Sequence, residues 1–172
     1  MDAQQLHDHI IKPTLEYMGG NYNTVEARFL LLCTAAIESE CGHYIKQVGG
    51  PALGIWQMEP ATHSDIWENC DALYDALGQS VVHLALHSNV NENHAFDGEA
   101  DLIHSPMYAC AMARLKYSMD AKALPKYNGG TDLDLDMFYR YYKRVYNTVH
   151  GKSTFSKWVD AINRNKVLEV NL

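Results

Sequence analysis

The segment from Asn23 to Gly42 constrains the fold of this chain more than any other. Asn23 is a residue type that caps helices, Glu26 stands three positions later as in a capping box, and Gly42 is suited to end a helix. The residues between them are apolar on nearly every side of a helix instead of along one stripe. Such a helix is typical of the middle of a domain. The sequence therefore predicts a central helix that is buried in a helical domain.

Helical periodicity continues through most of the chain, and no alternating pattern typical of a strand exceeds about four residues. Pro13 is expected to kink or split the first helix. A turn-rich stretch over 43–59 leaves room for a short β-hairpin, and a polar loop is predicted over 88–98. The other predicted helices are Asp2–Met18, Pro60–Cys70, 71–78, 80–87, a helix that starts at Ser105-Pro106, 134–149 and 155–168. We predict a single all-α domain over residues 1–172.

The formal net charge of −7, from 14 Lys and Arg against 21 Asp and Glu, limits the partners of the chain. Nucleic-acid binding depends on clustered basic side chains. The densest basic run, from Arg140 to Arg144, is interleaved with tyrosines. We therefore expect no nucleic-acid partner.

The N-terminus, from Met1 to Asp8, is acidic and polar where a secretory signal is basic and then apolar. No apolar stretch approaches the roughly 18 residues of a membrane span. The four cysteines have irregular spacing and form no CxxC pair, so reduced thiols are expected. These features predict neither a secretory signal nor a membrane span.

Glu38 is the residue best placed for acid–base chemistry. It falls in the last turn of the apolar helix, on the same stripe as Leu31 and Thr34. Apolar surroundings and the negative end of the helix dipole both predict a raised pKa for its carboxyl group. A carboxyl group that stays protonated near neutrality suits general-acid cleavage of a glycosidic bond. The alternative is a frayed helix end in solvent, and Glu40, about 200° further round the helix, is the more solvated of the two.

Three motifs follow one another in a fixed order. They are Glu-Ser at a helix end, G-x-x-Q-x-x-P-x-T after a glycine-rich loop, and Tyr-Asn-Gly-Gly. The matched positions are Glu38-Ser39, Gly54, Gln57, Pro60, Thr62 and Tyr127-Asn128-Gly129-Gly130. In this order the motifs resemble the soluble lytic transglycosylase and goose-type lysozyme superfamily, whose third motif is A-Y-N-A-G. The resemblance implies an α-rich, lysozyme-like fold.

The resemblance also implies roles for the first three matched residues. Glu38 would be the catalytic acid and base. Ser39 would hold a hydrogen bond near Glu38 or to the sugar. Gly54 would let the backbone approach the glycan closely, since a side chain there would intrude.

The remaining matched residues would complete the substrate site. Gln57 would hydrogen-bond to the sugar or to Glu38, and Tyr127 would place its hydroxyl near the reacting centre. Asn128 would brace the loop that presents Tyr127. Scaffold hydrogen bonding is the alternative for both Gln57 and Asn128. The chain departs from the family pattern at Lys126, where alanine is usual, and at Glu59, where an apolar residue is usual.

The function implied is degradation of the bacterial cell wall by a glycosidase. The substrate would be the β-1,4 bond between N-acetylmuramic acid and N-acetylglucosamine in peptidoglycan, and no cofactor or metal is expected. Glycosidases normally use two carboxylates, but the stretch from Cys41 to Met58 contains neither Asp nor Glu, and Glu59 is expected to lie past the substrate loop. A single carboxyl group favours a lytic transglycosylase, a lyase that leaves 1,6-anhydro ends.

Two alternatives stay open. A lysozyme-type muramidase would hydrolyse the same bond if Asp65 or Asp97 folds back to supply the second carboxylate. A non-catalytic phage structural protein with a lysozyme-like fold is the other. Because the net negative charge gives no attraction to an anionic wall, such a protein would need delivery. The expected location is a bacteriophage virion or tail, with other virion or tail proteins as partners, and a bacterial secretion-system accessory enzyme is the alternative.

Two further patterns resemble metal-binding motifs but lack residues that those motifs need. His83 and His87 have the spacing of paired metal ligands but lack the glutamate of HExxH. Asp132, Asp134 and Asp136 resemble the start of a calcium loop, but the glycine and glutamate of an EF-hand are missing, and a helix dipole explains the acids.

The aromatic residues divide between the core and a possible glycan groove. The helix near the C-terminus carries Phe138, Tyr139, Tyr141, Tyr142 and Tyr146. We expect most of this helix to pack in the core and part of it to be available to a glycan. Tyr44 and Trp56 are candidates for stacking on sugars, and Trp56 is equally suited to the core.

Overall fold

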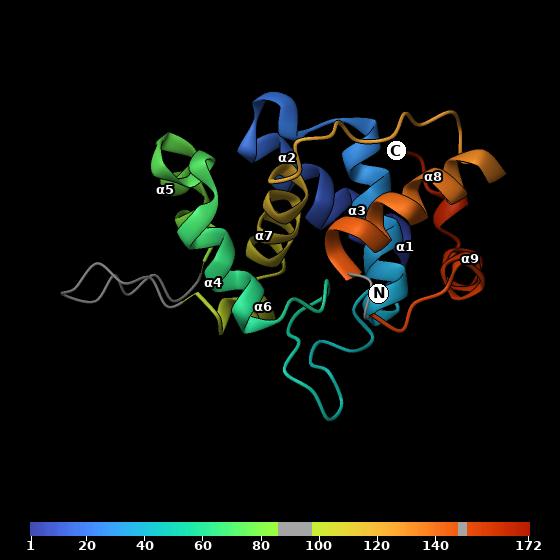
Figure 1. Cartoon of the computed structure of the whole chain (residues 1–172), viewed down its shortest axis with the longest axis horizontal. Coiled ribbons are helices and arrows are strands. Elements are labelled where there is room, and N and C mark those ends of the chain that lie inside the picture. The colour runs from blue at the N-terminus through green and yellow to red at the C-terminus, as the bar shows by residue number, and fades with distance from the viewer. Residues whose placement is uncertain (86–97, 148–150) are drawn as a thin grey trace.

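The computed structural model confirms an all-α fold, and it describes residues 1–85, 98–147 and 151–172 (Figure 1). The elements are α1 (Ala3–Leu6), η1 (His7–Ile11), α2 (Lys12–Met18), η2 (Gly20–Tyr22), α3 (Val25–Ser39), α4 (Pro60–Asn69), η3 (Asp71–Tyr74), α5 (Ala76–His83), α6 (Asp101–His104), α7 (Pro106–Ser118), α8 (Asp132–Tyr142), η4 (Lys143–Asn147), α9 (Phe155–Arg164) and η5 (Val167–Glu169). Residues 86 and 87 of the predicted 80–87 helix, the predicted loop up to 97, Asp97 and the end of the predicted 134–149 helix lie outside the described residues.

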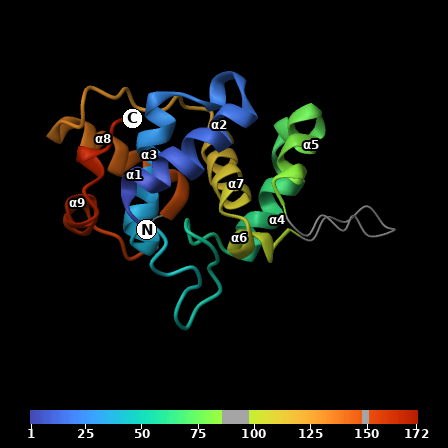
Figure 2. The ribbon, with the colours of Figure 1, turned by 180° about the vertical axis from the view of Figure 1, so that it is seen from behind.

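The predicted central helix is α3. In both views it stands between α7 on one side and α8 and α9 on the other (Figures 1 and 2). Ten of its side chains are buried, from Ala27 to Ser39. The predicted cap was one residue off, because Thr24, not Asn23, accepts a hydrogen bond from Ala27 N. The Asn23 side chain instead accepts a hydrogen bond from Arg28 Nε at 2.8 Å.

Pro13 is accommodated in the N-terminal helix by one wider turn, and the helix is not broken. The helix runs from α1 to α2 through a π-helical turn at η1, in which Lys12 N donates to His7 O. Proline has no N–H and crowds the preceding turn, so a wider turn accommodates it. The helix ends at Met18, followed by Gly19 with φ of 70°.

A second buried helix, α7, lies beside α3. Ser105 caps it as predicted, accepting a hydrogen bond from Tyr108 N at 3.3 Å. Nine side chains of α7 are buried, and they include Arg114, whose guanidinium donates to the backbone oxygens of Tyr22 and Asn21. The other helices, from α1 at the N-terminus to η5 at the C-terminus, pack around α3 and α7 and contribute side chains to one hydrophobic core.

The segment over 43–59 forms the projecting loop beneath α3 in Figures 1 and 2. The expected β-hairpin is reduced to two isolated antiparallel bridges, Lys46 with Leu53 and Leu53 with Met58. The second bridge closes a tight turn, because Leu53 and Met58 each donate to the carbonyl of the other at 2.9 Å. This turn carries Gly54 and Gln57.

The first of the two predicted C-terminal helices starts two residues earlier than predicted, at Asp132, and the second starts at Phe155 as predicted. Thr131 and Asp134 form a capping box at the start of α8, so the acids there serve the helix N-terminus. Beyond α8 the chain turns π-helical in η4. The predicted 155–168 helix is divided into α9 and η5 by Lys166, which has φ of 56°.

Candidate active site

A cleft of about 640 Å³ opens at the C-terminal end of α3. Its walls come from distant parts of the sequence: α3, the 43–59 loop, α4, α7, α8, η4 and the approach to α9. The polar and charged side chains that line it are Glu38, Gln47, Gln57, Glu59, Thr62, Lys116, Tyr142, Tyr146, Asn147, Lys152, Ser153 and Lys157. The cleft therefore gathers donors, acceptors and charges of both signs around Glu38.

The backbone after Ser39 fixes Glu38 in the last turn of α3. Glu40, Cys41 and Gly42 all have positive φ, at 51°, 52° and 81°, so the chain turns away sharply. Ser39 holds this reversal: its hydroxyl donates to Ile55 O at 2.5 Å and accepts from Gly42 N at 2.9 Å. The helix end and the 43–59 loop are thereby joined directly beside the carboxyl group.

Glu38 is half-buried, and its carboxylate is held by the C-terminal part of the chain. Tyr142 Oη donates to Glu38 Oε1 at 2.6 Å, and the side chain of Asn147 also hydrogen-bonds to this carboxyl group. Burial is the largest effect and raises the pKa of Glu38, although both hydrogen bonds and the charge of Lys143 lower it. The pKa of Tyr142 is also raised, by burial and by the neighbouring carboxylate.

Asn147 is oriented by a small network of its own. Its Oδ1 accepts from Lys143 Nζ at 2.7 Å and from Ser153 Oγ at 2.8 Å, and Lys143 Nζ also donates to Gly151 O at 2.6 Å. With Oδ1 occupied, the Nδ2 group is left to donate to Glu38. The η4 turn thus presents a fixed donor to the carboxylate.

Buried aromatic residues hold η4 in place. Tyr146 Oη donates to Trp56 O at 2.9 Å, and its ring stacks on Tyr117 at 5.2 Å between centroids. Trp56 is buried and donates its indole N–H to Leu31 O at 3.0 Å. Trp56 is therefore a core residue and not a sugar-stacking one, whereas Tyr44 is half exposed.

Ser39 and Gly54 are needed for reasons other than those predicted. Ser39 is only 1% exposed and its hydroxyl is already bonded, so it positions the loop and does not reach a bound sugar. A Cβ on Gly54 would lie 2.1 Å from Leu102 O. The close approach at Gly54 is therefore made by the backbone of α6, not by a glycan.

Gln57 does line the cleft with Glu38. Its Nε2 donates to Gly54 O at 2.7 Å and to Tyr44 O at 3.2 Å, which is the scaffold role that the sequence left open. Among the described residues its Oε1 has no hydrogen-bond partner, so this oxygen is available to a ligand hydroxyl. The residue also has a positive φ of 46°, a strained conformation that the surrounding turn maintains.

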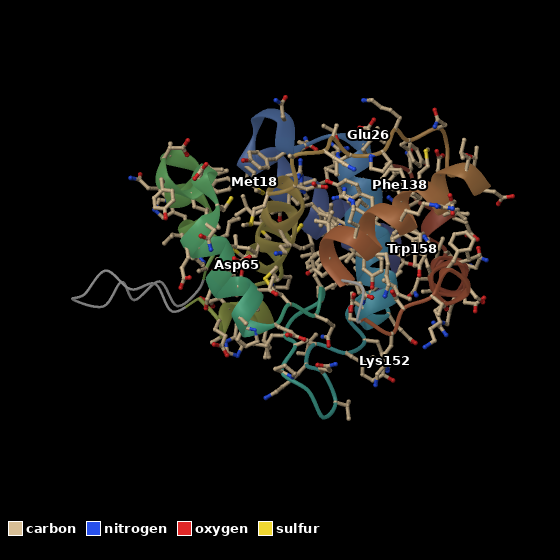
Figure 3. The ribbon with its side chains drawn as sticks, in the orientation of Figure 1. Met18, Glu26, Asp65, Phe138, Lys152 and Trp158 are labelled. Carbon is tan, nitrogen blue, oxygen red and sulfur yellow. The ribbon has the colours of Figure 1, made fainter. Side chains whose placement is uncertain are left out.

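Tyr127 and Asn128 are not brought to Glu38. The 126–131 segment crosses the opposite end of α3 from the 43–59 loop, near Glu26 (Figures 1 and 3). Tyr127 packs on Phe29 at 4.7 Å between ring centroids, about 13 Å along the helix from Glu38. Asn128 braces its loop as expected, but it does so against the Asp134 carboxylate at 3.0 Å. Neither residue lines the cleft.

A different Tyr-Asn pair occupies the position expected of Tyr127-Asn128. Tyr146 and Asn147 are adjacent in sequence and both line the cleft. The repeated dipeptide was a sequence signal for these residues. Tyr142 had no such signal, since it stands out only as one of several tyrosines on an aromatic helix.

The carboxylates near the cleft also differ from expectation. Glu59, predicted to lie past the substrate loop, is exposed and lines the same cleft as Glu38. Asp65 does not line it and lies 3.3 Å from Lys116 Nζ. Glu40 points elsewhere and lies 3.6 Å from Arg164. Among the described residues, the second carboxylate that lines the cleft is therefore Glu59.

Comparisons of the chain with protein-family models, curated proteins and solved structures give no match. Within residues 1–85, 98–147 and 151–172, no helix is long and apolar enough to cross a membrane. In the same residues no group of three or more His, Cys, Asp or Glu side chains is arranged to hold a metal ion.

Proposed function

We propose that this protein cleaves the glycan strands of bacterial peptidoglycan, at the β-1,4 bond between N-acetylmuramic acid and N-acetylglucosamine. One observation carries the proposal: a half-buried carboxyl group, Glu38, lies in a polar cleft, and burial raises its pKa. Such a group is suited to protonate a glycosidic oxygen. The first two motifs, Glu38-Ser39 and the segment from Gly54 to Thr62, support the same substrate.

The favoured reaction is that of a lytic transglycosylase. Glu38 protonates the departing oxygen of N-acetylglucosamine as its bond to C1 of the muramoyl sugar breaks. The N-acetyl group of the substrate stabilises the resulting cation. The Glu38 carboxylate then takes the proton of the C6 hydroxyl, whose oxygen bonds to C1 and closes the 1,6-anhydro ring. Glu38 is regenerated and no water is consumed.

Tyr142 and Asn147 stabilise Glu38 in its deprotonated form during the reaction. Their hydrogen bonds favour the carboxylate that exists between the two proton transfers. Gln57 Oε1, which belongs to a residue lining the same cleft, is available to a sugar hydroxyl. The reaction therefore needs residues of this chain alone, and the proposal includes no cofactor.

Hydrolysis by a lysozyme-type muramidase is the second candidate, and Glu59 favours it. With two carboxylates on one cleft, Glu59 would activate a water or stabilise the cation while Glu38 protonates the leaving oxygen. The product would then carry a free reducing end.

Mass spectrometry of the muropeptides released from purified sacculi tests the proposal. We expect 1,6-anhydro products from the wild type and none from Glu38→Gln. Glu40→Gln is the matched control, because Glu40 lies two residues away but pairs with Arg164 outside the cleft. Binding without release by the wild type would leave only the non-catalytic structural alternative.

Glu59→Gln separates the two reactions. A transglycosylase should keep most of its activity in this variant, whereas a hydrolase that uses Glu59 should lose about a hundredfold or more. Reducing-end products together with that loss would establish the muramidase.

The proposed place of action is the bacterial wall, reached as part of a phage virion or tail. The net charge of −7 supports delivery by a carrier over adsorption to an anionic wall. Detection of the chain in purified particles by mass spectrometry is the test, and its absence from them would contradict this location.

A further inference from the structure

Positive charge gathers on the cleft even though the chain as a whole is negative. Lys116, Lys152 and Lys157 line it. Lys116 is partly neutralised by Asp65, whose Oδ2 lies 3.3 Å from its ammonium group. Within the described part of the chain, Lys152 and Lys157 form no ion pair. The uncompensated charge is therefore at the α9 side of the cleft.

The Lys157 side chain reaches the backbone of Lys152, because Lys157 Nζ donates to the backbone oxygen of Lys152 at 3.5 Å. They stand before and in the first turn of α9, a helix of ten residues with no acidic residue in that turn. The partial positive charge of a helix N-terminus adds to their field. Figure 3 shows Lys152 below α3, on the side of the 43–59 loop.

The two sides of the cleft thus differ in charge. Towards α4 and α7 lie Glu59 and the pair of Lys116 with Asp65. Towards α9 lie two exposed ammonium groups beside Ser153. Glycan without stems offers these two cations only one carboxylate on each muramoyl sugar. Their complement is a substituent that carries more than one carboxylate.

We infer that Lys152 and Lys157 bind carboxylates of the peptide stems that branch from the muramoyl sugars. This inference rests on the proposed function, because it places the glycan across Glu38 and a stem towards α9. The preferred substrate is then stem-bearing peptidoglycan. Glycan stripped of its stems keeps only the single lactyl carboxylate on each muramoyl sugar.

The test compares soluble glycan strands that carry stems with the same strands after removal of the stems by an amidase. Binding is measured with the Glu38→Gln variant, so that turnover does not interfere. We expect tighter binding of the stem-bearing strands. Lys152→Ala/Lys157→Ala, added to that background, should reduce this preference about three- to tenfold, as for one or two exposed ion pairs.

The matched control is Lys12→Ala/Lys122→Ala, which removes the same charge from exposed lysines that do not line the cleft. It should leave the preference unchanged, and added salt should weaken the preference of the unmodified cleft. Equal binding of both strands, or an equal loss for both in the Lys152/Lys157 variant, would overturn the stem assignment. If the wild type cleaves both strands equally well, the inference fails and the proposed function stands. If it cleaves neither, the proposed function itself fails.

Discussion

A carboxyl group that donates a proton must be neutral when the substrate binds and charged immediately afterwards. At Glu38 these two requirements are met by different parts of the structure. Burial favours the neutral form and raises the pKa, while Tyr142 and Asn147 favour the charged form. Because the contributions oppose each other, each can be altered separately.

Tyr142→Phe removes the hydrogen bond that lowers the pKa of Glu38. We expect the alkaline limb of the pH–rate profile, where Glu38 loses its proton, to move to higher pH, with a reduced maximum rate. The measurement is muropeptide release across pH. Tyr127→Phe is the control, since this hydroxyl lies at the other end of α3, and its profile should match the wild type. A shift in Tyr127→Phe alone would restore the original motif assignment.

Glu38→Gln is predicted to stabilise the protein at neutral pH. Because burial raises the pKa of Glu38 above its ordinary value of 4.5, the folded state binds more protons than the unfolded state between that value and the folded pKa. Stability therefore falls as pH rises through this window. We expect a gain on the order of 1 kcal/mol at pH 7 that disappears below about pH 4. Denaturant unfolding at the two pH values measures it, and a constant difference across pH would contradict the argument.

At the scale of elements, the end of α3 and the 43–59 loop form one unit, joined by Ser39 and packed on α6 through Gly54. The turn from Gly54 to Gln57 carries one wall of the cleft. Displacing this turn should therefore affect both stability and activity.

Comparing Gly54→Ala with Gly129→Ala separates two effects on stability: the steric clash of an added methyl group and the strain of a positive φ. Both glycines have positive φ, at 74° and 89°, but a Cβ on Gly54 would meet Leu102 O at 2.1 Å, whereas one on Gly129 would meet nothing within 4 Å. We expect Gly129→Ala to cost about 1–2 kcal/mol and Gly54→Ala about 3 kcal/mol or more. Chemical denaturation measures the loss of unfolding free energy in both variants. Equal losses would mean that α6 can move away from the added methyl group at little energetic cost.

The helices were predictable because their signals are local. Burial of α3 follows from its apolar periphery, and the start of α7 follows from Ser105-Pro106. Errors arose where neighbouring residues compete for one role, as Asn23 and Thr24 do for the cap. The burial of Arg114 in α7 was not predictable from local sequence, since it depends on backbone oxygens of Asn21 and Tyr22 far away in the chain.

Only the part of the candidate site that depends on local sequence was predictable. Glu38 follows from its place at a buried helix end. Tyr142 and Asn147 reach it from more than a hundred residues away, and no spacing rule connects them. Tyr127-Asn128 fits the motif through its two following glycines, but in the structure those glycines belong to the loop before α8.

At the scale of the whole molecule, one core includes buried residues from α1 to η5. We therefore predict a single cooperative unfolding transition for residues 1–172, with equal calorimetric and van't Hoff enthalpies. Scanning calorimetry is the measurement. Two resolved transitions would show that the chain contains separately stable units.

The hydrogen bond between Tyr142 and Glu38 also has a consequence for protein synthesis. The hydroxyl that holds the Glu38 carboxylate is made 104 residues after the acid itself. A nascent or prematurely terminated copy therefore carries Glu38 without the partners that adjust its proton affinity. For a protein proposed to cut glycan strands, the proposed acid therefore reaches its final proton affinity only after the segment that carries Tyr142 has been made and packed against it.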